Sequence, residues 1–350
     1  MTSLADYTTL GLGGPARTFV SASAEADLVE SVRAADAAGE PVLLIGGGSN
    51  LVISDAGFPG TAIHIGTRGL AYAQAGVNAV DATVAAGEDW DDVVAATVAD
   101  GLAGLETLSG IPGRAGATPI QNVGAYGREV AEVITQVRVY DRQDDQITVI
   151  PNEACSFAYR TSLFKAIGPR YVVLAVTFRL AAQPLSMPVK YAELAAELGV
   201  QVGQRAGVSD VRAAVLKIRA RKGMVLSPGD PDTRSAGSFF TNPIISLDQF
   251  ARVEATAADR GIAGPVPRYG AGDGLVKVSA AWLIECSGFA KGYGAPAPAR
   301  VSSKHTLALT NTGNATTADL VALAREIVEG VQATFDVTLT PEPTLIGVTL

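Results

Sequence analysis

Three polar residues stand in surroundings that suit chemistry. Arg160 lies in the aromatic segment 158–162, where a guanidinium either pairs with a structural carboxylate or binds a ligand carboxylate through its planar fork. Ser238 stands between a glycine and two phenylalanines, and Glu342 stands between two prolines that stiffen its backbone. Plain turns are the alternative for both, and the segment around Ser238 is not the Gly-x-Ser-x-Gly elbow of hydrolases. The sharper hypothesis is that Arg160 recognises a ligand and that Glu342 is aimed at a site.

Two glycine-rich regions could hold a ligand. Residues 46–50 (Gly-Gly-Gly-Ser-Asn) follow an apolar run, and consecutive glycines let backbone N–H groups converge on an anion; a structural tight turn is the alternative. Residues 108–113 and 121–127 combine small residues and amide side chains with almost no charge. Such a surface suits a planar polar ring, and a long ordered loop is the alternative. The run at 46–50 does not match the Rossmann fingerprint and contains no P-loop lysine.

Composition excludes several other kinds of protein. The formal net charge is −8, whereas proteins that bind nucleic acid usually carry the opposite balance. Cys155 and Cys286 are far apart, and the two histidines, His64 and His305, leave little room for a zinc or iron site. No apolar stretch approaches the roughly 20 residues of a membrane span. The first ten residues contain Asp6 and no Lys or Arg, so we expect no secretory signal and a cytoplasmic protein.

Alternating strand and helix signals in the first half must position these loops. Residues 41–45 predict a buried strand that enters the glycine run, after a helix that Ser23 caps and Gly39 ends. Residues 133–140 and 146–150 alternate around a polar turn and predict a hairpin. Further elements are expected at 79–86 (strand), 89–100 (helix) and 171–180 (strand). This mixture of hairpins and helices favours an α+β domain over a doubly wound parallel sheet.

The second half is richer in helices. After a linker at 183–188, helices are predicted at 191–198, 209–222, 246–260, 279–285 and, capped by Thr317, along the apolar face that ends at Phe335. Strand-like segments at 337–339 and 345–350 flank the Pro-Glu-Pro turn. The 209–222 helix ends in a basic run of Arg212, Lys217, Arg219, Arg221 and Lys222. The helix dipole explains part of this run, and a diphosphate clamp would explain it too.

The motif order resembles that of one enzyme family. GGGSN, SGIPG, QNVGAYG, YRTS, AGSFFTNP and PEP follow one another as in the UDP-N-acetylenolpyruvoylglucosamine reductases, flavoenzymes of peptidoglycan precursor synthesis, from about Gly11 to Ile346. The resemblance implies an α+β fold with a vanillyl-alcohol-oxidase-like (PCMH-type) FAD-binding domain at 1–182, whose two subdomains divide near 70. It further implies a substrate-binding domain at 183–335 and a C-terminal segment, 336–350, that returns to the FAD domain and active site.

The resemblance also implies a role for each matching residue. Arg160 would stabilise negative charge, Ser238 would donate a proton, and Glu342 would be the catalytic glutamate. The cofactor would lie against Gly46, Gly47, Gly48, Ser49, Asn50, Ser109, Gly110, Ile111, Gly113, Asn122 and Gly127. The substrate would contact Tyr191, as in the tyrosine-loop subclass, together with Lys222 on its diphosphate and Asn242 on its uridyl side.

The reaction implied by the resemblance has two stages. NADPH reduces FAD and leaves, and hydride then passes from flavin N5 to C3 of UDP-N-acetylglucosamine enolpyruvate while Ser238 delivers a proton to C2. The product is UDP-N-acetylmuramate. The glycine run contains no histidine that could link flavin, so we expect noncovalent FAD. We expect no metal, nucleic-acid, membrane or obligatory protein partner.

Two rival functions are a flavin oxidase of the same fold and a nucleotide-binding module that has lost its chemistry. The joint presence of Arg160, Ser238 and Glu342 argues against the module, and the last two residues argue against the oxidase.

Overall fold

The computed structural model describes residues 2–272 and 274–350, which form two compact units. Unit 1 consists of Thr2, Ala16–Gly48 and Pro59–Val225. Unit 2 consists of Ser3–Pro15, Ser49–Phe58 and Leu226–Leu350, so the chain passes from one unit to the other inside the glycine run, after Gly48. Residues 183–225 belong to unit 1 by packing, whereas the expected substrate domain begins at 183. The functional domain boundaries stay a prediction.

A small sheet opens unit 1. It has the strand order β1-β4-β2, with β2 and β4 parallel, and comprises β1 (Ala16–Ala22), β2 (Val42–Ile45) and β4 (Phe58–Ile65). Helix α1 (Glu25–Ala37) buries Leu28 and Val32 in a core that also contains Ile63 of this sheet. The predicted strand and helix are confirmed, but the cap is wrong. The helix begins after Ala24, whose backbone is extended, and no side chain caps it.

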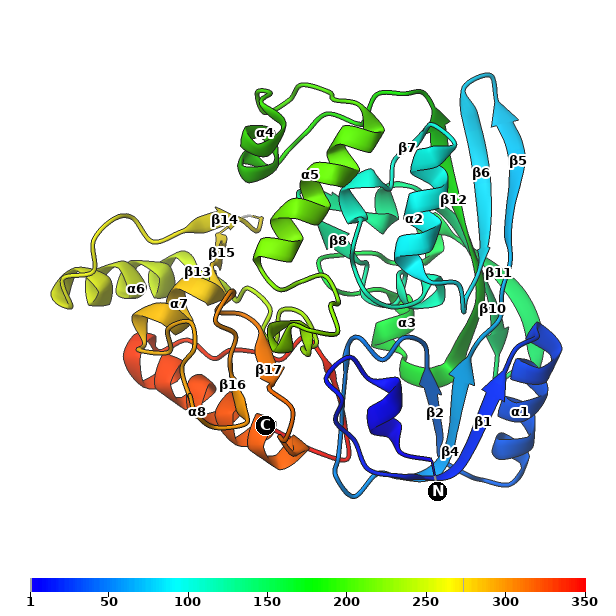
Figure 1. Cartoon of the computed structure of the whole chain (residues 1–350), viewed down its shortest axis with the longest axis horizontal. Helices are drawn as coiled ribbons and strands as arrows, with labels where there is room; N and C mark the ends of the chain where they lie inside the picture. Colours follow the sequence, from blue (N-terminus) through cyan, green and yellow to red (C-terminus); the bar gives the residue numbers. More distant parts are fainter. Residues whose placement is uncertain (1, 273) are drawn as a thin grey trace. The chain divides into compact units, whose positions relative to one another are not determined.

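A larger sheet with strand order β11-β10-β12-β6-β5 forms the centre of unit 1, and the short β7 pairs with β12 (Figure 1). Its strands are β5 (Leu70–Gly76), β6 (Ala79–Ala85), β7 (Leu102–Ala103), β10 (Ile134–Asp141), β11 (Gln146–Pro151) and β12 (Tyr171–Ala182). The predicted hairpin is confirmed as β10–β11. Helix α2 (Trp90–Ala99) packs Trp90 against Phe178 of β12, with ring centroids 5.5 Å apart.

Shorter elements complete unit 1. They are the hairpin β8 (Gly124–Ala125) and β9 (Arg128–Glu129), α3 (Leu163–Ala166), and the helix pair α4 (Ala192–Leu198) and α5 (Val208–Arg221). The helix pair has its own small core, to which Val189, Leu194, Val215 and Ile218 contribute. Both helices lie close to their predicted positions.

The described residues of unit 2 combine three small sheets with three α-helices. The sheets pair β3 (Leu51–Ile53) with β18 (Thr344–Ile346), β16 (Ala299–Val301) with β17 (Leu309–Asn311), and β15 (Leu275–Val278) with both β13 (Ile244–Ser246) and β14 (Arg268–Gly270). The helices are α6 (Leu247–Asp259), α7 (Ala280–Cys286) and α8 (Thr317–Phe335). One apolar core joins them, with Phe239, Phe240 and Ile327 among its buried members.

Two predictions about the end of the chain are wrong. Thr316, not Thr317, caps α8 in a capping box with Asp319, because the hydroxyl of Thr317 donates instead to the carbonyl of Ile53. Residues 337–339 form no strand, and the final strand is limited to Thr344–Ile346, which pairs in parallel with β3. Among the described residues, no helix has the length and apolarity needed to cross a bilayer.

Candidate active site

The two glycine loops of unit 1 contact each other through bare backbone. A Cβ at Gly47 would lie 2.8 Å from the Cα of Gly113, and a Cβ at Gly46 would lie 3.2 Å from the side chain of Arg114. Only glycine permits this approach at position 47. Within unit 1, the predicted cofactor segments 46–48 and 109–113 therefore form one cradle.

Several polar groups of the described residues around this cradle form hydrogen bonds within the protein, whereas a few buried nitrogen atoms do not. The N–H of Gly110 donates to Asp91 (2.6 Å), which also accepts two hydrogen bonds from Arg212, and the buried hydroxyl of Ser109 donates to the carbonyl of Glu106. Among the described residues, the buried Nε atoms of Arg114 and Arg219 have no hydrogen-bond partner, although the Nη atoms donate to Asp89 and to the carbonyl of Met224, respectively. Burial lowers the pKa of Arg219, and negative charge nearby, such as that of Asp91, opposes this shift. A backbone cradle flanked by two such cations fits a dinucleotide pyrophosphate.

Asn122 shapes the second predicted loop from within. It is 1% exposed, donates through Nδ2 to Glu129 and to the carbonyl of Ala158, and accepts at Oδ1 from the N–H of Ala131. Its side chain therefore fastens the loop. A contact between Asn122 and the cofactor stays a prediction.

Arg160 is fixed by that same loop. Its guanidinium donates to the carbonyls of Asn122 (3.4 Å) and Gly124 (2.9 Å) and lies 5.3 Å from the ring centre of Tyr159. Arg160 and Asn122 both have positive φ, 54° and 47°, which non-glycine residues adopt rarely and which concentrates at functional sites. The residue is thus held in one orientation by strained backbone.

The β8–β9 hairpin contains Tyr126, which is not among the expected site residues. Tyr126 and Gly127 form its two-residue turn with φ of 52° and 79°, the signs of a type I′ turn. A Cβ at Gly127 would lie 2.8 Å from the Cβ of Lys190, and the ring of Tyr126 packs edge-on against Tyr191, with centroids 5.6 Å apart. Burial raises the pKa of Tyr126 to about 12. Gly127 therefore permits a close approach between the hairpin and the segment that carries Tyr191.

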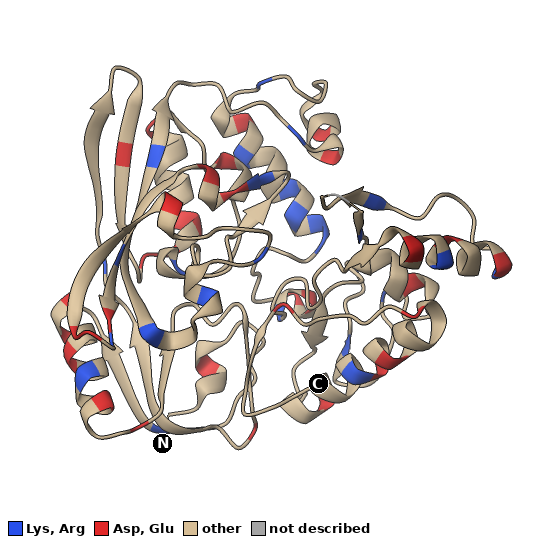
Figure 2. Cartoon of the chain, turned by 180° about the vertical axis from the view of Figure 1, so that it is seen from behind, with Lys and Arg blue, Asp and Glu red and all other residues tan. Residues whose placement is uncertain are grey.

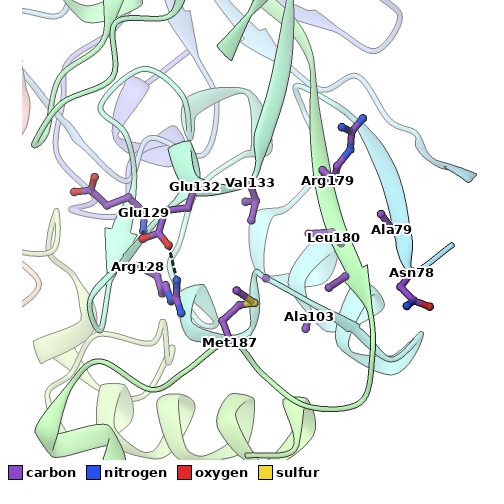
Figure 3. A pocket seen from close by; sticks show the side chains of 12 residues that line it. Asn78, Ala79, Ala103, Arg128, Glu129, Glu132, Val133, Arg179, Leu180 and Met187 are labelled. Carbon is purple, nitrogen blue, oxygen red and sulfur yellow. Dashed lines mark hydrogen bonds and ion pairs between the residues drawn. The ribbon is translucent and has the colours of Figure 1, made fainter. Parts of the chain in front are cut away.

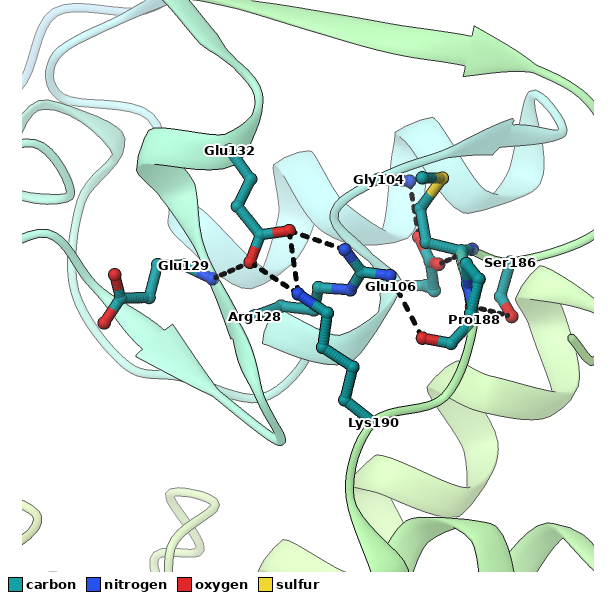
Figure 4. A network of polar contacts seen from close by, with 9 residues as sticks. Gly104, Glu106, Arg128, Glu129, Glu132, Ser186, Pro188 and Lys190 are labelled. Atoms are coloured by element: carbon teal, nitrogen blue, oxygen red, sulfur yellow. Dashed lines mark hydrogen bonds and ion pairs between the residues drawn. The ribbon is translucent and has the colours of Figure 1, made fainter. Parts of the chain in front are cut away.

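Tyr191 directly follows residues 184–190, which are called the strap, and polar contacts fasten the strap to the rest of unit 1 (Figure 4). Arg128 donates to Glu132 (2.5 Å) and to the carbonyl of Pro188 (3.0 Å), and Lys190 pairs with the same Glu132 at 3.4 Å. The strap's Met187 N–H donates to Glu106, which is 1% exposed. These contacts fix the position of Tyr191, which directly follows the strap.

Two predicted substrate residues meet at the end of the strap. Tyr191 directly precedes α4 and is 40% exposed, while Lys222 follows α5 and pairs with Glu193 of α4 at 2.6 Å. Lys and Arg follow one another along α5 (Figure 2). The structure thus groups Tyr191, Lys222 and the additional Tyr126 at one place in unit 1.

The strap also borders a pocket of about 240 Å³ (Figure 3). Met187, Arg128 and Glu132 contribute to its wall, together with Leu180 and Arg179 of β12. It contains none of the expected site residues, and Arg179 is already paired with Asp81. The pocket is therefore separate from the candidate site.

Ser238 and Glu342 are brought together in unit 2 by backbone hydrogen bonds. The N–H of Glu342 donates to the carbonyl of Phe239 (2.8 Å), and the N–H of Thr241 donates to the carbonyl of Thr340 (3.0 Å). Phe239 and Phe240 are 0% and 1% exposed, so the segment after Ser238 is anchored in the core. Ser238 and Glu342 thus belong to one rigid frame.

Three further expected site residues, Ser49, Asn50 and Asn242, lie in unit 2. Asn50 donates through Nδ2 to the carbonyl of Glu342 at 3.3 Å. Asn242 accepts the N–H of Ala280, the first residue of α7, at 2.9 Å. Ligand contacts of all three residues stay predictions.

Comparisons with known proteins identify the family. Residues 16–150 match a model described as FAD binding domain, and residues 230–346 match the model of the UDP-N-acetylenolpyruvoylglucosamine reductase C-terminal domain. The UDP-N-acetylenolpyruvoylglucosamine reductase of Thermobifida fusca is 55% identical, with 99% of this chain and 97% of that protein covered. The chain belongs to the UDP-N-acetylenolpyruvoylglucosamine reductase family.

Other reductases of this family are also similar to the chain. The enzyme of that name from Streptomyces avermitilis is 56% identical, with 99% of this chain and 94% of the relative covered. The crystal structure of the Thermus caldophilus reductase superimposes with a TM-score of 0.65 at 26% identity and covers 99% of this chain and 97% of that chain. The expected α+β FAD-binding fold is therefore confirmed, and so are an oxidoreductase and FAD as its cofactor.

Proposed function

We propose that the chain reduces UDP-N-acetylglucosamine enolpyruvate to UDP-N-acetylmuramate, with NADPH as the reductant, in peptidoglycan precursor synthesis. Family membership over 99% of the chain supports this function. The structural observation that supports it most is the hydrogen bond that holds Glu342 against Phe239, directly beside Ser238. The proposed reaction takes place in the cytoplasm on a small-molecule substrate, without an obligatory protein partner.

The protein's own residues bind, orient and protonate in this mechanism. FAD, when bound, supplies the hydride acceptor and donor that link NADPH to the substrate. Arg160 stabilises the negative charge that grows on the substrate carboxylate as C3 receives hydride, and Glu342 helps to hold this carboxylate or a proton near it. Ser238 then moves its hydroxyl proton to C2, completing the addition of one hydride and one proton across the double bond.

The substrate diphosphate binds to Tyr191 and Lys222 in the proposed complex, and the uridyl side to Asn242. The phenol of Tyr191 and the ammonium of Lys222 are hydrogen-bond donors, which suits an anionic diphosphate. Lys222 exchanges its ion pair with Glu193 for the ligand, because that pair is only partly buried and therefore contributes little.

Steady-state turnover tests the function. NADPH oxidation by the FAD-loaded protein should depend on UDP-N-acetylglucosamine enolpyruvate, and mass spectrometry should find UDP-N-acetylmuramate in equal amount. Arg179→Lys, which alters an exposed ion pair with Asp81 on β6, is the matched control and should retain wild-type turnover. NADPH oxidation that needs only oxygen, at the same rate with and without the sugar nucleotide, would establish the oxidase alternative instead.

A further inference from the structure

Asn50 ends the glycine run, yet it forms two hydrogen bonds with the segment of the proposed catalytic glutamate. Its Nδ2 donates to the carbonyl of Glu342 at 3.3 Å. Its own carbonyl accepts the N–H of Thr344 at 2.9 Å, where the parallel pairing of β18 with β3 begins. Asn50 therefore contacts the chain both at Glu342 and two residues after it.

The opposite side of Glu342 is held by the Ser238 segment. The N–H of Glu342 donates to Phe239, and Pro341 forms a bridge with Phe240. Neither Pro341 nor Pro343 has an N–H group, so Glu342 supplies the main-chain donor of residues 341–343. Its N–H is bonded to Phe239 and its carbonyl to Asn50.

We propose that Asn50 is a positioning residue for Glu342. Its carboxamide fixes the peptide of Glu342 from the side opposite Ser238, and so sets the distance between the glutamate carboxylate and the serine hydroxyl. This inference rests on the proposed function, and it gives the side chain of Asn50 a task other than binding FAD. A displacement of about 1 Å in a reacting group can cost about 10²-fold in rate, which makes a single positioning contact measurable.

The reaction separates into two half-reactions, and only the second uses Glu342 in the proposed mechanism. In Asn50→Ala, measured with FAD in excess, reoxidation by the sugar nucleotide should slow about 10- to 100-fold more than reduction of the flavin by NADPH. Asn50→Asp keeps the size but replaces the donor with a carboxylate oxygen that repels the Glu342 carbonyl, and its loss should be at least as large.

Amide hydrogen exchange provides a readout that does not depend on turnover. Loss of one hydrogen bond should raise the exchange rate of the Glu342 and Thr344 amides about 2- to 10-fold. Asn152→Ala is the matched control, because Asn152 also donates through Nδ2 to distant main-chain carbonyls, those of Ala131 and Ile134. It should leave both the ratio of the half-reactions and the exchange of Glu342 unchanged.

The outcomes separate this inference from the proposed function. Equal slowing of both half-reactions in Asn50→Ala, or unchanged exchange at Glu342 in both Asn50 variants, would overturn the positioning role. A wild-type enzyme whose reduced flavin does not react with the sugar nucleotide would overturn the proposed function alone. In that case the exchange measurement still decides whether Asn50 holds Glu342.

Discussion

Arg160 in unit 1 and the Ser238–Glu342 pair in unit 2 are held by different kinds of contact. The guanidinium of Arg160 donates to the carbonyls of its own loop, and the backbone there has positive φ at Asn122, Tyr126 and Arg160. In unit 2, the backbone bond from Glu342 to Phe239 involves neither reacting side chain. Substitution of Ser238 therefore leaves its frame intact, whereas substitution of Arg160 also removes contacts that shape its loop.

This difference predicts how cleanly each residue can be tested. A variant of Ser238 should report on the chemistry alone. A variant of Arg160 should combine loss of chemistry with loss of loop order, so its effects should appear in both rate and stability.

Ser238→Ala should show the largest effect on a single step. A serine hydroxyl is a very weak acid, so it serves as donor only to the strong base that forms after hydride transfer. Reoxidation of reduced flavin by the sugar nucleotide should slow by about 10²–10⁴-fold, with flavin reduction and melting temperature near wild type. Rapid-mixing absorbance measures both steps. Reoxidation within a factor of about ten of wild type would remove Ser238 from the mechanism.

Arg160→Lys should come next. It retains the charge but loses the planar fork, and loss of one electrostatic donor typically costs about 10²–10³-fold. The sugar-nucleotide step should fall by that amount, and the melting temperature should fall below that of Ser238→Ala because the Asn122 and Gly124 carbonyls lose a donor. Calorimetry compares the two variants. Equal melting temperatures would contradict the contrast between the two regions.

Gly127→Ala tests the close approach in unit 1. Its φ is 79° and an added Cβ would lie 2.8 Å from Lys190, so we expect a loss of about 1–3 kcal/mol in the free energy of unfolding. Gly199 has φ of 68° with nothing within 4 Å of an added Cβ, so Gly199→Ala isolates the cost of the dihedral angle. Urea unfolding should show the larger loss for Gly127→Ala. Equal losses would mean that the strap yields to the added methyl group.

Glu132→Gln should have the smallest effect. It removes the charge that Arg128 and Lys190 share, and partly exposed pairs contribute up to about 1 kcal/mol. KM for the sugar nucleotide should rise by up to about fivefold at low salt and less at high salt, with the limiting rate unchanged. A change in the limiting rate without a change in KM would show that the strap contacts do not position Tyr191.

The elements of this fold could be predicted wherever local chemistry marks them. The strand before Gly46 ends because glycines interrupt an apolar run, and α2 begins directly after Asp89, whose carboxylate accepts the N–H of Asp91. The hairpin β10–β11 follows from alternation around a polar turn. Among the site residues, Tyr191 and Lys222 were expected on the substrate side, and the structure places both at one end of the α4–α5 pair.

Long-range pairing could not be predicted in this way. Nothing in residues 51–53 indicates that they pair with residues 344–346, since a short parallel pair leaves no turn between its strands. The cap of α8 was misplaced by one residue because Thr316 and Thr317 are adjacent and only the contact of Thr317 with Ile53 decides between them. Gly127 in QNVGAYG indicates the turn at Tyr126. The contact of Tyr126 with Tyr191, however, depends on the path of the strap.

A single turnover without oxygen tests the central claim most directly. The FAD-loaded protein is reduced with one equivalent of NADPH, freed of NADP⁺ by gel filtration, and mixed anaerobically with UDP-N-acetylglucosamine enolpyruvate in D₂O. The proposed function predicts reoxidation of the flavin and one equivalent of UDP-N-acetylmuramate with deuterium at C2. Flavin that stays reduced until oxygen is admitted, with no lactyl ether formed, would contradict it.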